Sequence, residues 1–118
     1  FIKEYLMSSL QETDNAAAAV ATHPRVTLGD IEANIKARYD ITADDAVAPY
    51  GPVVDELRLL SICILVTKSG FTVIGKSAPA SPENFNAELG KKFAYEDAVR
   101  QLWPLMGYAL RERLYHGF

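Results

Sequence analysis

Two extended runs joined by a short turn constrain the fold of this chain more than any other feature. The first run, Leu59–Thr67, is almost wholly apolar, and the second, Phe71–Ser77, is rich in β-branched side chains. Ser69-Gly70 lies between them and suits a two-residue turn, because glycine adopts the positive φ that such turns require. The sequence therefore predicts a β-hairpin over residues 59–77.

A two-residue turn also predicts which side chains share a face of the hairpin. Val66 would pair with Val73, and paired residues point to the same side. The apolar face must then be covered by the long helix described below. A two-stranded ribbon is marginal alone, so either the N-terminal elements or the same face of another subunit must cover the mixed face. The apolar face comprises Leu60, Ile62, Ile64, Val66, Phe71 and Val73, and the mixed face comprises Ser61, Cys63, Leu65, Thr67, Thr72, Ile74 and Lys76.

A long helix is predicted after the hairpin. Ser81-Pro82-Glu83 supplies an N-cap, a proline suited to the first helical position and an acid for the positive helix end. The helix is expected to run to about Leu102, and Trp103-Pro104 to end or kink it before a last helix over residues 105–115. Its apolar side chains recur with a 3.6-residue period at Phe85, Leu89, Phe93, Ala94, Ala98 and Leu102.

Two glycines are placed for close packing between this helix and the hairpin. Gly75 lies in the second strand and leaves room for another backbone, a helix or a ligand. Gly90 lies in the helix, where glycine costs about 1 kcal/mol relative to alanine, so its expected use is close packing on the strands.

Helical patterns also precede the hairpin. Residues 1–15 form a weak amphipathic stripe through Ile2, Tyr5, Leu6 and Leu10. It predicts a helix packed on its own domain or on a neighbouring subunit, with a partner-binding arm as the alternative. A second helix, residues 28–39, is expected to begin at a cap formed by Thr27 and Asp30 and to bury Leu28, Ile31 and Ile35. Residues 40–52 are rich in Asp, Gly and Pro and are predicted to form a loop.

These elements predict an α+β fold, in which a β-hairpin or small antiparallel sheet is packed by a long C-terminal helix and shorter N-terminal helices. We divide the chain into an N-terminal helical extension, residues 1–22, and a single α+β domain, residues 23–118. A chain of 118 residues has a small core, and such chains often gain stability by oligomerising. The sequence therefore favours a homo-oligomer.

Composition argues against several functional classes. A net charge of −3 provides no global field to attract nucleic acid or anionic membrane, and no apolar run approaches a membrane span. His23 and His116 are the only histidines, and no phosphate loop, dinucleotide fingerprint or zinc spacing occurs. The single Cys63 cannot form an internal disulfide and fits a reducing cytosol. We therefore predict a non-enzymatic protein without a cofactor, a metal, a membrane or a nucleic-acid partner.

A candidate anion site lies where the second strand leads into the long helix. Polar side chains gather there beside the amides of the helix start, which attract anions. Cationic and aromatic side chains from the last helix would complete the site from another subunit and suit a nucleotide-like ligand. In the alternative interpretation the asparagines are helix caps and the arginines a solvated helix end. The candidate ligand-binding residues are Lys76, Ser77, Asn84, Asn86, Tyr108, Arg111 and Arg113.

Several stretches of this chain resemble a family of small tailed-phage proteins named for the phage N4 gene 49 and phage Sf6 gene 66 products. The resemblance covers about residues 24–110 and rests on framework features: a turn, a helix cap, close-packing glycines and a kink. The matching stretches are Pro24–Ile31, Gly70–Ala78, Ser81–Asn86, Gly90, Ala94, Ala98, Trp103-Pro104-Leu105 and Gly107-Tyr108.

The resemblance implies a phage accessory protein in the bacterial host cytoplasm. The family has no settled activity, but small phage proteins of this kind often act stoichiometrically on the host, and some are oligomeric sponges for nucleotide immune signals. Our first hypothesis is therefore a homo-oligomeric anti-defence protein that captures a small nucleotide-type ligand. The second is a protein-binding inhibitor of a host factor that uses the N-terminal helix as its arm. The third is a structural virion component.

Overall fold

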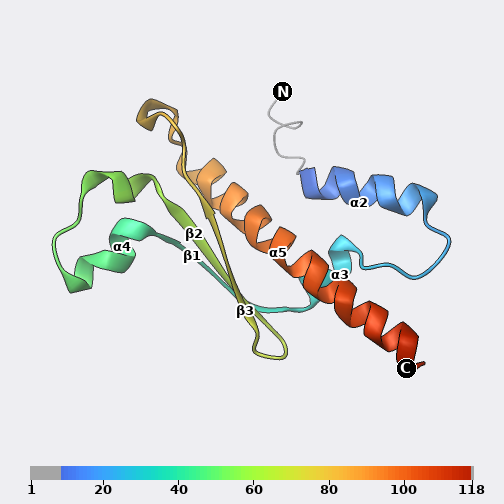
Figure 1. The fold of residues 1–118 in the computed structure, drawn as a ribbon. Coiled ribbons are helices and arrows are strands. Elements are labelled where there is room, and N and C mark those ends of the chain that lie inside the picture. The colour runs from blue at the N-terminus through green and yellow to red at the C-terminus, as the bar shows by residue number, and fades with distance from the viewer. Residues whose placement is uncertain (1–8, 118) are drawn as a thin grey trace.

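The computed structural model describes residues 9–117 as a three-stranded antiparallel sheet with one long helix and several short ones (Figure 1). The strand order is β1-β2-β3, which confirms the α+β class. In chain order the elements are α2 (Ser9–Val20), α3 (Leu28–Ala33), β1 (Ile35–Thr42), α4 (Ala43–Val47), the 3-10 helices η1 (Ala48–Tyr50) and η2 (Asp55–Leu59), β2 (Ser61–Thr67), β3 (Thr72–Ser77), the 3-10 helix η3 (Pro82–Asn84) and α5 (Ala87–His116).

Strand β1 replaces part of a predicted helix and part of a predicted loop. The start of α3 is as predicted, since Thr27 and Asp30 form a reciprocal capping box with both hydrogen bonds at 2.9 Å. The helix ends at Ala33, however, and Asn34 caps it. From Ile35 onward apolar and polar residues alternate, which is the period of a strand. Backbone partners on β2 then favour the strand over a longer helix.

The hairpin is confirmed, but its predicted register is wrong by one residue. Val66 pairs with Thr72 and not with Val73, because the turn contains three residues instead of two. The Gly70 N–H donates to the Thr67 carbonyl at 2.9 Å, and Gly70 adopts a φ of 90°. A left-handed residue is what a three-residue turn with a bulge requires.

The changed register alters which face of β2 the long helix covers. Cys63 and Leu65 are fully buried beneath α5, whereas the predicted covered side chains of β2 point to the opposite side. Val73 on β3 is buried as predicted. A shift of one residue exchanges the two faces of a strand. An error of one residue in the turn therefore assigns the side chains of β2 to the wrong face.

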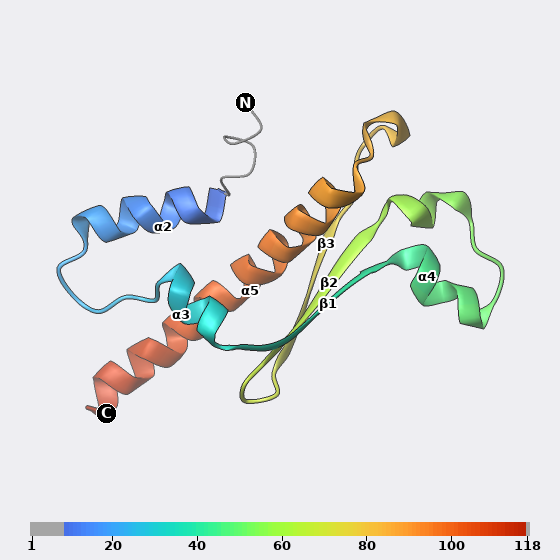
Figure 2. The same cartoon turned by 180° about the vertical axis from the view of Figure 1, so that it is seen from behind.

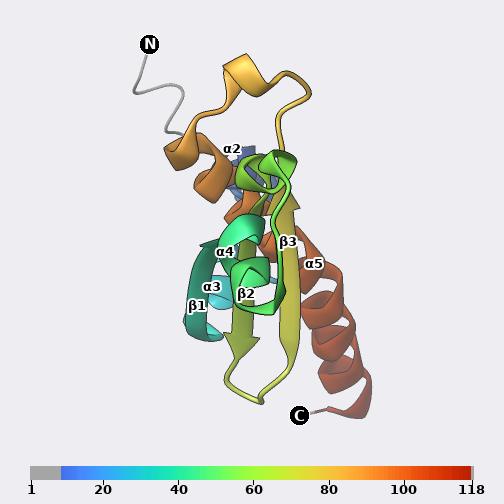
Figure 3. The ribbon, with the colours of Figure 1, turned by 90° about the vertical axis from the view of Figure 1, so that its left-hand side faces the viewer.

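The core is formed by this face of the sheet, by α5, which packs on β2 and β3 (Figures 1 and 3), and by buried side chains of α2 and α3. The predicted close packing at the two glycines is confirmed. A Cβ added at Gly75 would overlap the Ala94 carbonyl oxygen and lie 2.5 Å from the Ala98 nitrogen, and one added at Gly90 would lie 2.5 Å from Ser61 Oγ. The core comprises Leu10, Leu28, Ile31, Cys63, Leu65, Val73, Ala94, Ala98, Val99 and Leu102.

Helix α5 begins and ends later than predicted. Ser81 precedes η3 without a side-chain cap, and Asn86 caps α5 instead, accepting a backbone N–H at 3.0 Å. Pro104 lies inside the helix, so the predicted end near residue 102 and the separate last helix are wrong. Trp103 and Met106 pack against the core on either side of Pro104, which holds the helix together despite the missing N–H.

Helix α2 packs on its own chain. Leu10 is buried in the core, as the amphipathic stripe predicted. Asp14 contacts the segment that leads into α3. Ile2, Tyr5 and Leu6 lie outside the described residues. In Figures 1 and 2, α5 lies between α2 and the strands, so α2 is remote from the sheet.

Candidate functional site

A groove between α3, the β2–β3 turn and the C-terminal half of α5 is the candidate ligand site. Its volume of about 450 Å³ is within the range of small-molecule sites. Three cationic side chains, one amide and one carboxylate line it, and its apolar wall belongs mainly to α5. We call it the α3–α5 groove, and its residues are Arg25, Val26, Asp30, Ala33, Asn34, Lys68, Met106, Ala109, Leu110 and Arg113.

Asn34 joins the three walls of the α3–α5 groove. It caps the C-terminus of α3, and its carbonyl accepts the Lys68 N–H at 3.0 Å, which fixes the β2–β3 turn beside the helix. Its side-chain Nδ2 donates to Met106 Sδ on α5 at 3.6 Å. A thioether is a weak acceptor, so this amide retains the capacity to bond a stronger acceptor on a ligand.

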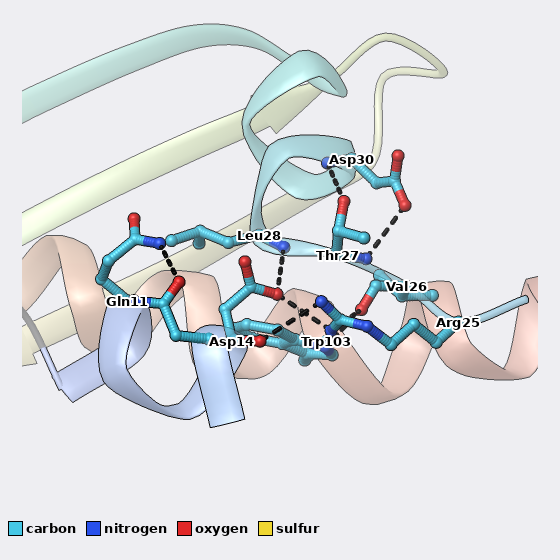
Figure 4. Close-up of polar contacts among 9 residues, drawn as sticks. Gln11, Asp14, Arg25, Val26, Thr27, Leu28, Asp30 and Trp103 are labelled. Atoms are coloured by element: carbon cyan, nitrogen blue, oxygen red, sulfur yellow. Dashed lines mark hydrogen bonds and ion pairs between the residues drawn. The ribbon is translucent and has the colours of Figure 1, made fainter. Parts of the chain in front are cut away.

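The segment before α3 is fixed by a network around Asp14 (Figure 4). Arg25 Nη1 donates to Asp14 Oδ1 at 2.9 Å, and the Leu28 N–H donates to the same oxygen at 3.1 Å. Trp103 Nε1 donates to the Val26 carbonyl at 3.3 Å and ties the segment to α5. Because Asp14 offsets the charge of Arg25, the main role of Arg25 is to shape the edge of the groove.

Asp30 contributes a carboxylate to the α3–α5 groove. The Thr27 N–H, followed by the Thr27 hydroxyl, holds the pKa of Asp30 below its ordinary value. The charges of Arg25 and Arg113 lower this pKa further. Asp30 is therefore ionised at neutral pH and has the capacity to accept hydrogen bonds from a hydroxyl or an amine.

Lys68 and Arg113 provide the available positive charge of the groove. Both side chains are exposed, and within residues 9–117 neither makes a hydrogen bond or a close ion pair. Lys68 comes from the β2–β3 turn and Arg113 from the end of α5, so the two cations approach the groove from different elements. Together they suit a phosphate group, which charged donors bind more strongly than neutral ones do.

Three of the seven predicted site residues do come together, at the junction before α5. Ser77, Asn84 and Asn86 line a separate pocket of about 210 Å³. Asn86 is engaged as the cap of α5, as the alternative interpretation held. The rest of the lining is largely apolar, and no cation belongs to it. This pocket therefore offers an anion little beyond the polar groups of its edge.

The other four predicted residues lie elsewhere. Lys76 pairs with Ile62 and shares its side of the sheet, away from α5. Tyr108, Arg111 and Arg113 lie in the last turns of α5, about 30 Å or more from its start. Of these four only Arg113 lines the α3–α5 groove. Their approach to the junction from another subunit stays a prediction.

The sequence does not identify four polar residues of the groove as site residues. Its patterns indicate Asp30 only as a helix cap and give Lys68, Arg25 and Asn34 no functional role. Each of these residues lies at or near the end of a helix or in a turn, where polar side chains are common, so its residue type alone does not indicate a binding role. Only the pairing of β1 with β2 brings Asn34 and Lys68 together, and β1 was not predicted.

A second polar cluster lies between β1 and α5. Arg38 Nε donates to both carboxylate oxygens of Asp40, at 3.2 and 3.0 Å, and its guanidinium lies 4.0 Å from the centre of the Tyr95 ring. Burial, followed by the charge of Asp40, raises the pKa of the neighbouring Cys63 to about 11. A buried thiol that stays protonated is not a nucleophile, so this cluster stabilises the packing of β1 on α5.

Cys63 is accordingly expected to resist thiol reagents in the folded protein. A pKa raised from 9.0 to about 11 lowers the thiolate fraction at neutral pH about a hundredfold, and burial blocks access as well. The rate of reaction with Ellman's reagent, followed by absorbance, measures this. The same sample in denaturant is the control and should react completely. Fast stoichiometric reaction of the native protein would contradict the assigned environment.

Between Ser9 and Gly117 the chain presents no group of three or more His, Cys, Asp or Glu residues that could hold a metal ion. In the same range no helix has the length and apolar character needed to cross a membrane.

A family model matches most of the chain. The family is described as "Phage protein (N4 Gp49/phage Sf6 gene 66) family", and the match covers residues 26–114. No curated protein and no solved structure matches the chain. The matched segment contains the sheet, nearly all of α5 and every lining residue of the α3–α5 groove except Arg25. The resemblance in the sequence is thus confirmed, and this protein belongs to the phage protein family of N4 Gp49 and Sf6 gene 66.

Proposed function

We propose that this protein is a non-enzymatic phage accessory protein that captures a small nucleotide-type ligand in the α3–α5 groove. By sequestering that ligand in the host cytoplasm, it would lower the concentration of a nucleotide immune signal, which is an anti-defence role. Membership of a phage family supports the viral setting. The residues of the groove support the class of ligand.

The observation that carries the proposal is the combination of two available cations with a carboxylate and an apolar wall. Lys68 and Arg113 suit a phosphate. Asp30 is an acceptor for the hydroxyls of a ribose. Met106 and Leu110 offer half-buried apolar surface on which a base can lie. Phosphate, sugar and base each find a chemically matched group in one groove.

The arm hypothesis receives less support from the position of α2. Its described residues are engaged with the chain itself, since Leu10 is buried and Asp14 bonds both Arg25 and the Leu28 N–H. Releasing the helix to bind a host protein would expose Leu10 and leave Arg25 without its partner. A docked helix therefore favours ligand capture over an inhibitory arm.

Binding is tested by isothermal titration of the protein against cyclic dinucleotides, cyclic mononucleotides and ADP-ribose-like nucleotides. We expect one class to bind, with an affinity that falls as salt rises, because exposed charges are screened. Arg113→Ala should weaken this binding about tenfold to a hundredfold, since a charged hydrogen bond contributes roughly 1.5–3 kcal/mol.

The matched control is Arg111→Ala. Arg111 lies two residues away on the same exposed helix end but does not line the groove, so its loss should change affinity less than about twofold at moderate salt. Absence of heat from every nucleotide, with the protein folded by circular dichroism, would refute the proposed function. Equal losses for both variants would show that general charge, and not the groove, attracts the ligand.

A further inference from the structure

The sheet face opposite α5 is apolar and lacks a covering layer among the described residues. It consists of three rows of paired side chains, one residue from each strand: Ile41–Ile62–Lys76, Tyr39–Ile64–Ile74 and Ala37–Val66–Thr72. Lys76 is the only charged residue of the nine. We call this surface the open face.

The open face presents apolar side chains to solvent on all three strands. Tyr39 is 56% exposed and Ile74 is 58% exposed, while Ile62, Ile64 and Val66 in the central strand are only partly buried. A contiguous apolar patch that is depleted of charge and contains an aromatic residue has the composition of an interface core.

The two edges of the sheet are protected, which directs association to the face. On the outer edge of β3, the Lys76 N–H donates to Asp97 Oδ2 at 2.9 Å, and the Ile74 carbonyl accepts Gln101 Nε2 at 2.6 Å. Both partners come from α5 and occupy groups that another strand would need. At the other edge, β1 has a register irregularity between Ile35 and Ala37, which disfavours extension of the sheet.

We propose that the open face binds the open face of a second copy of this chain, forming a two-fold symmetric dimer. Two sheets pack face to face at about 10 Å, and two such faces would together bury on the order of 1,000 Å², which is the lower bound for a specific interface. A second copy is also made wherever the protein is made, so the apolar surface would be covered from synthesis onward. This inference is independent of ligand binding in the groove.

The arrangement of side chains suits self-association. Ile64 lies at the centre of the middle row, so a two-fold axis through the centre of the interface places it against Ile64 of the partner subunit. Lys76 lies at a corner. With the axis along the strands Lys76 faces Ile41 of the partner subunit, and with the axis across them it faces Thr72 of the partner subunit. Neither orientation brings the two lysines together, so like charges do not oppose the pairing.

Helix α5 lies on the other side of the sheet from the open face. The α3–α5 groove is therefore outside the proposed interface, and each subunit of a dimer keeps its own groove accessible. A dimer of this kind does not bring Arg111 or Tyr108 to the partner's strand-to-helix junction.

Size-exclusion chromatography with light scattering tests the inference. The wild-type protein should have twice the 13.0 kDa mass of the chain. Ile74→Lys places a charge in the middle row and should halve the measured mass, because a buried unpaired charge is strongly unfavourable. Since Ile74 is 58% exposed in the single chain, circular dichroism should report the same fold. Tyr39→Lys, on the opposite edge strand, is a second variant with the same expected result.

The matched control is Leu114→Lys, because Leu114 is an aliphatic residue of similar exposure, 53%, at the far end of α5. This variant should remain dimeric. A wild-type monomer would overturn the inference and leave the open face to a different protein. A dimer that persists in both Ile74→Lys and Tyr39→Lys would place the interface elsewhere on the molecule.

Discussion

Replacement of Gly75 by alanine is expected to lower the free energy of unfolding by about 3 kcal/mol or more. An added Cβ would meet the backbone of α5 at Ala94 and Ala98, and backbone atoms cannot move aside as a flexible side chain can. Overpacking a well-filled core typically costs about 1–3 kcal/mol, and a clash with a helix backbone lies at or above the top of that range. Urea unfolding followed by circular dichroism measures the change.

The matched control is the same substitution at Gly107, also within α5. Nothing lies within 4 Å of a Cβ added there, and the backbone is helical. Gly107→Ala should therefore raise stability, by up to about 1 kcal/mol, because alanine is the better helix former. Similar effects of the two substitutions would mean that α5 does not cross β3 at Gly75.

Replacement of Leu65 by alanine is expected to lower the free energy of unfolding by about 2–5 kcal/mol. Leu65 is fully buried at the centre of β2 and faces α5, so its loss leaves a cavity in addition to the lost transfer free energy. Measurement in the Ile74→Lys background isolates the single chain, because the open face is then not covered by a second copy. Chemical denaturation monitored by Trp103 fluorescence is a suitable readout.

The neighbouring substitution Ile64→Ala distinguishes the two faces of β2. In the same background Ile64 is partly exposed on the face away from α5, so its truncation should cost less than that of the fully buried Leu65. The register predicted from the sequence requires the reverse order, with Ile64 beneath the helix. A larger effect at Ile64 than at Leu65 would restore that register and remove the basis for the open face.

Local signals were sufficient for the parts of the fold that depend on neighbouring residues. Thr27 and Asp30 correctly predict the start of α3. Gly75 and Gly90 correctly predict where α5 packs closely on the strands. The predicted buried face of α5 is only partly right. It includes Phe93, which is 41% exposed, and omits Val99, which is fully buried. A 3.6-residue period locates a face to within about one residue position, and strand packing decides the rest.

The missed features depend on partners that are distant in the sequence. Residues 35–42 alternate with a period of two, but Ile31 and Ile35 also fit a helix, and only the ladder to β2 decides between them. The hairpin turn was assigned two residues because Ser69-Gly70 suits the commoner turn, yet a third residue shifts every later pair. Such choices are settled by the sum of tertiary contacts and not by local preference.

The candidate site was the part least accessible to sequence reasoning. Arg113 was singled out for its charge, and it does line the α3–α5 groove. Its companions Lys68, Asn34 and Asp30 have ordinary structural duties as turn and cap residues. These residues converge because β1 pairs with β2. The pairing places Asn34, just before β1, beside Lys68, just after β2.

Pro104 separates the part of α5 that is buried in the core from the part that lines the groove. Every fully buried residue of α5 precedes it, from Ala94 to Leu102, whereas the turns after it carry Met106, Leu110 and Arg113 of the groove. Proline also leaves the Arg100 carbonyl without its usual helical donor, so cooperativity along the helix is weakest at this point. Leu110 and Arg113 lie after this point and are not among the residues that pack against the core, so substitutions there could change the ligand affinity of the proposed groove with little cost to folding.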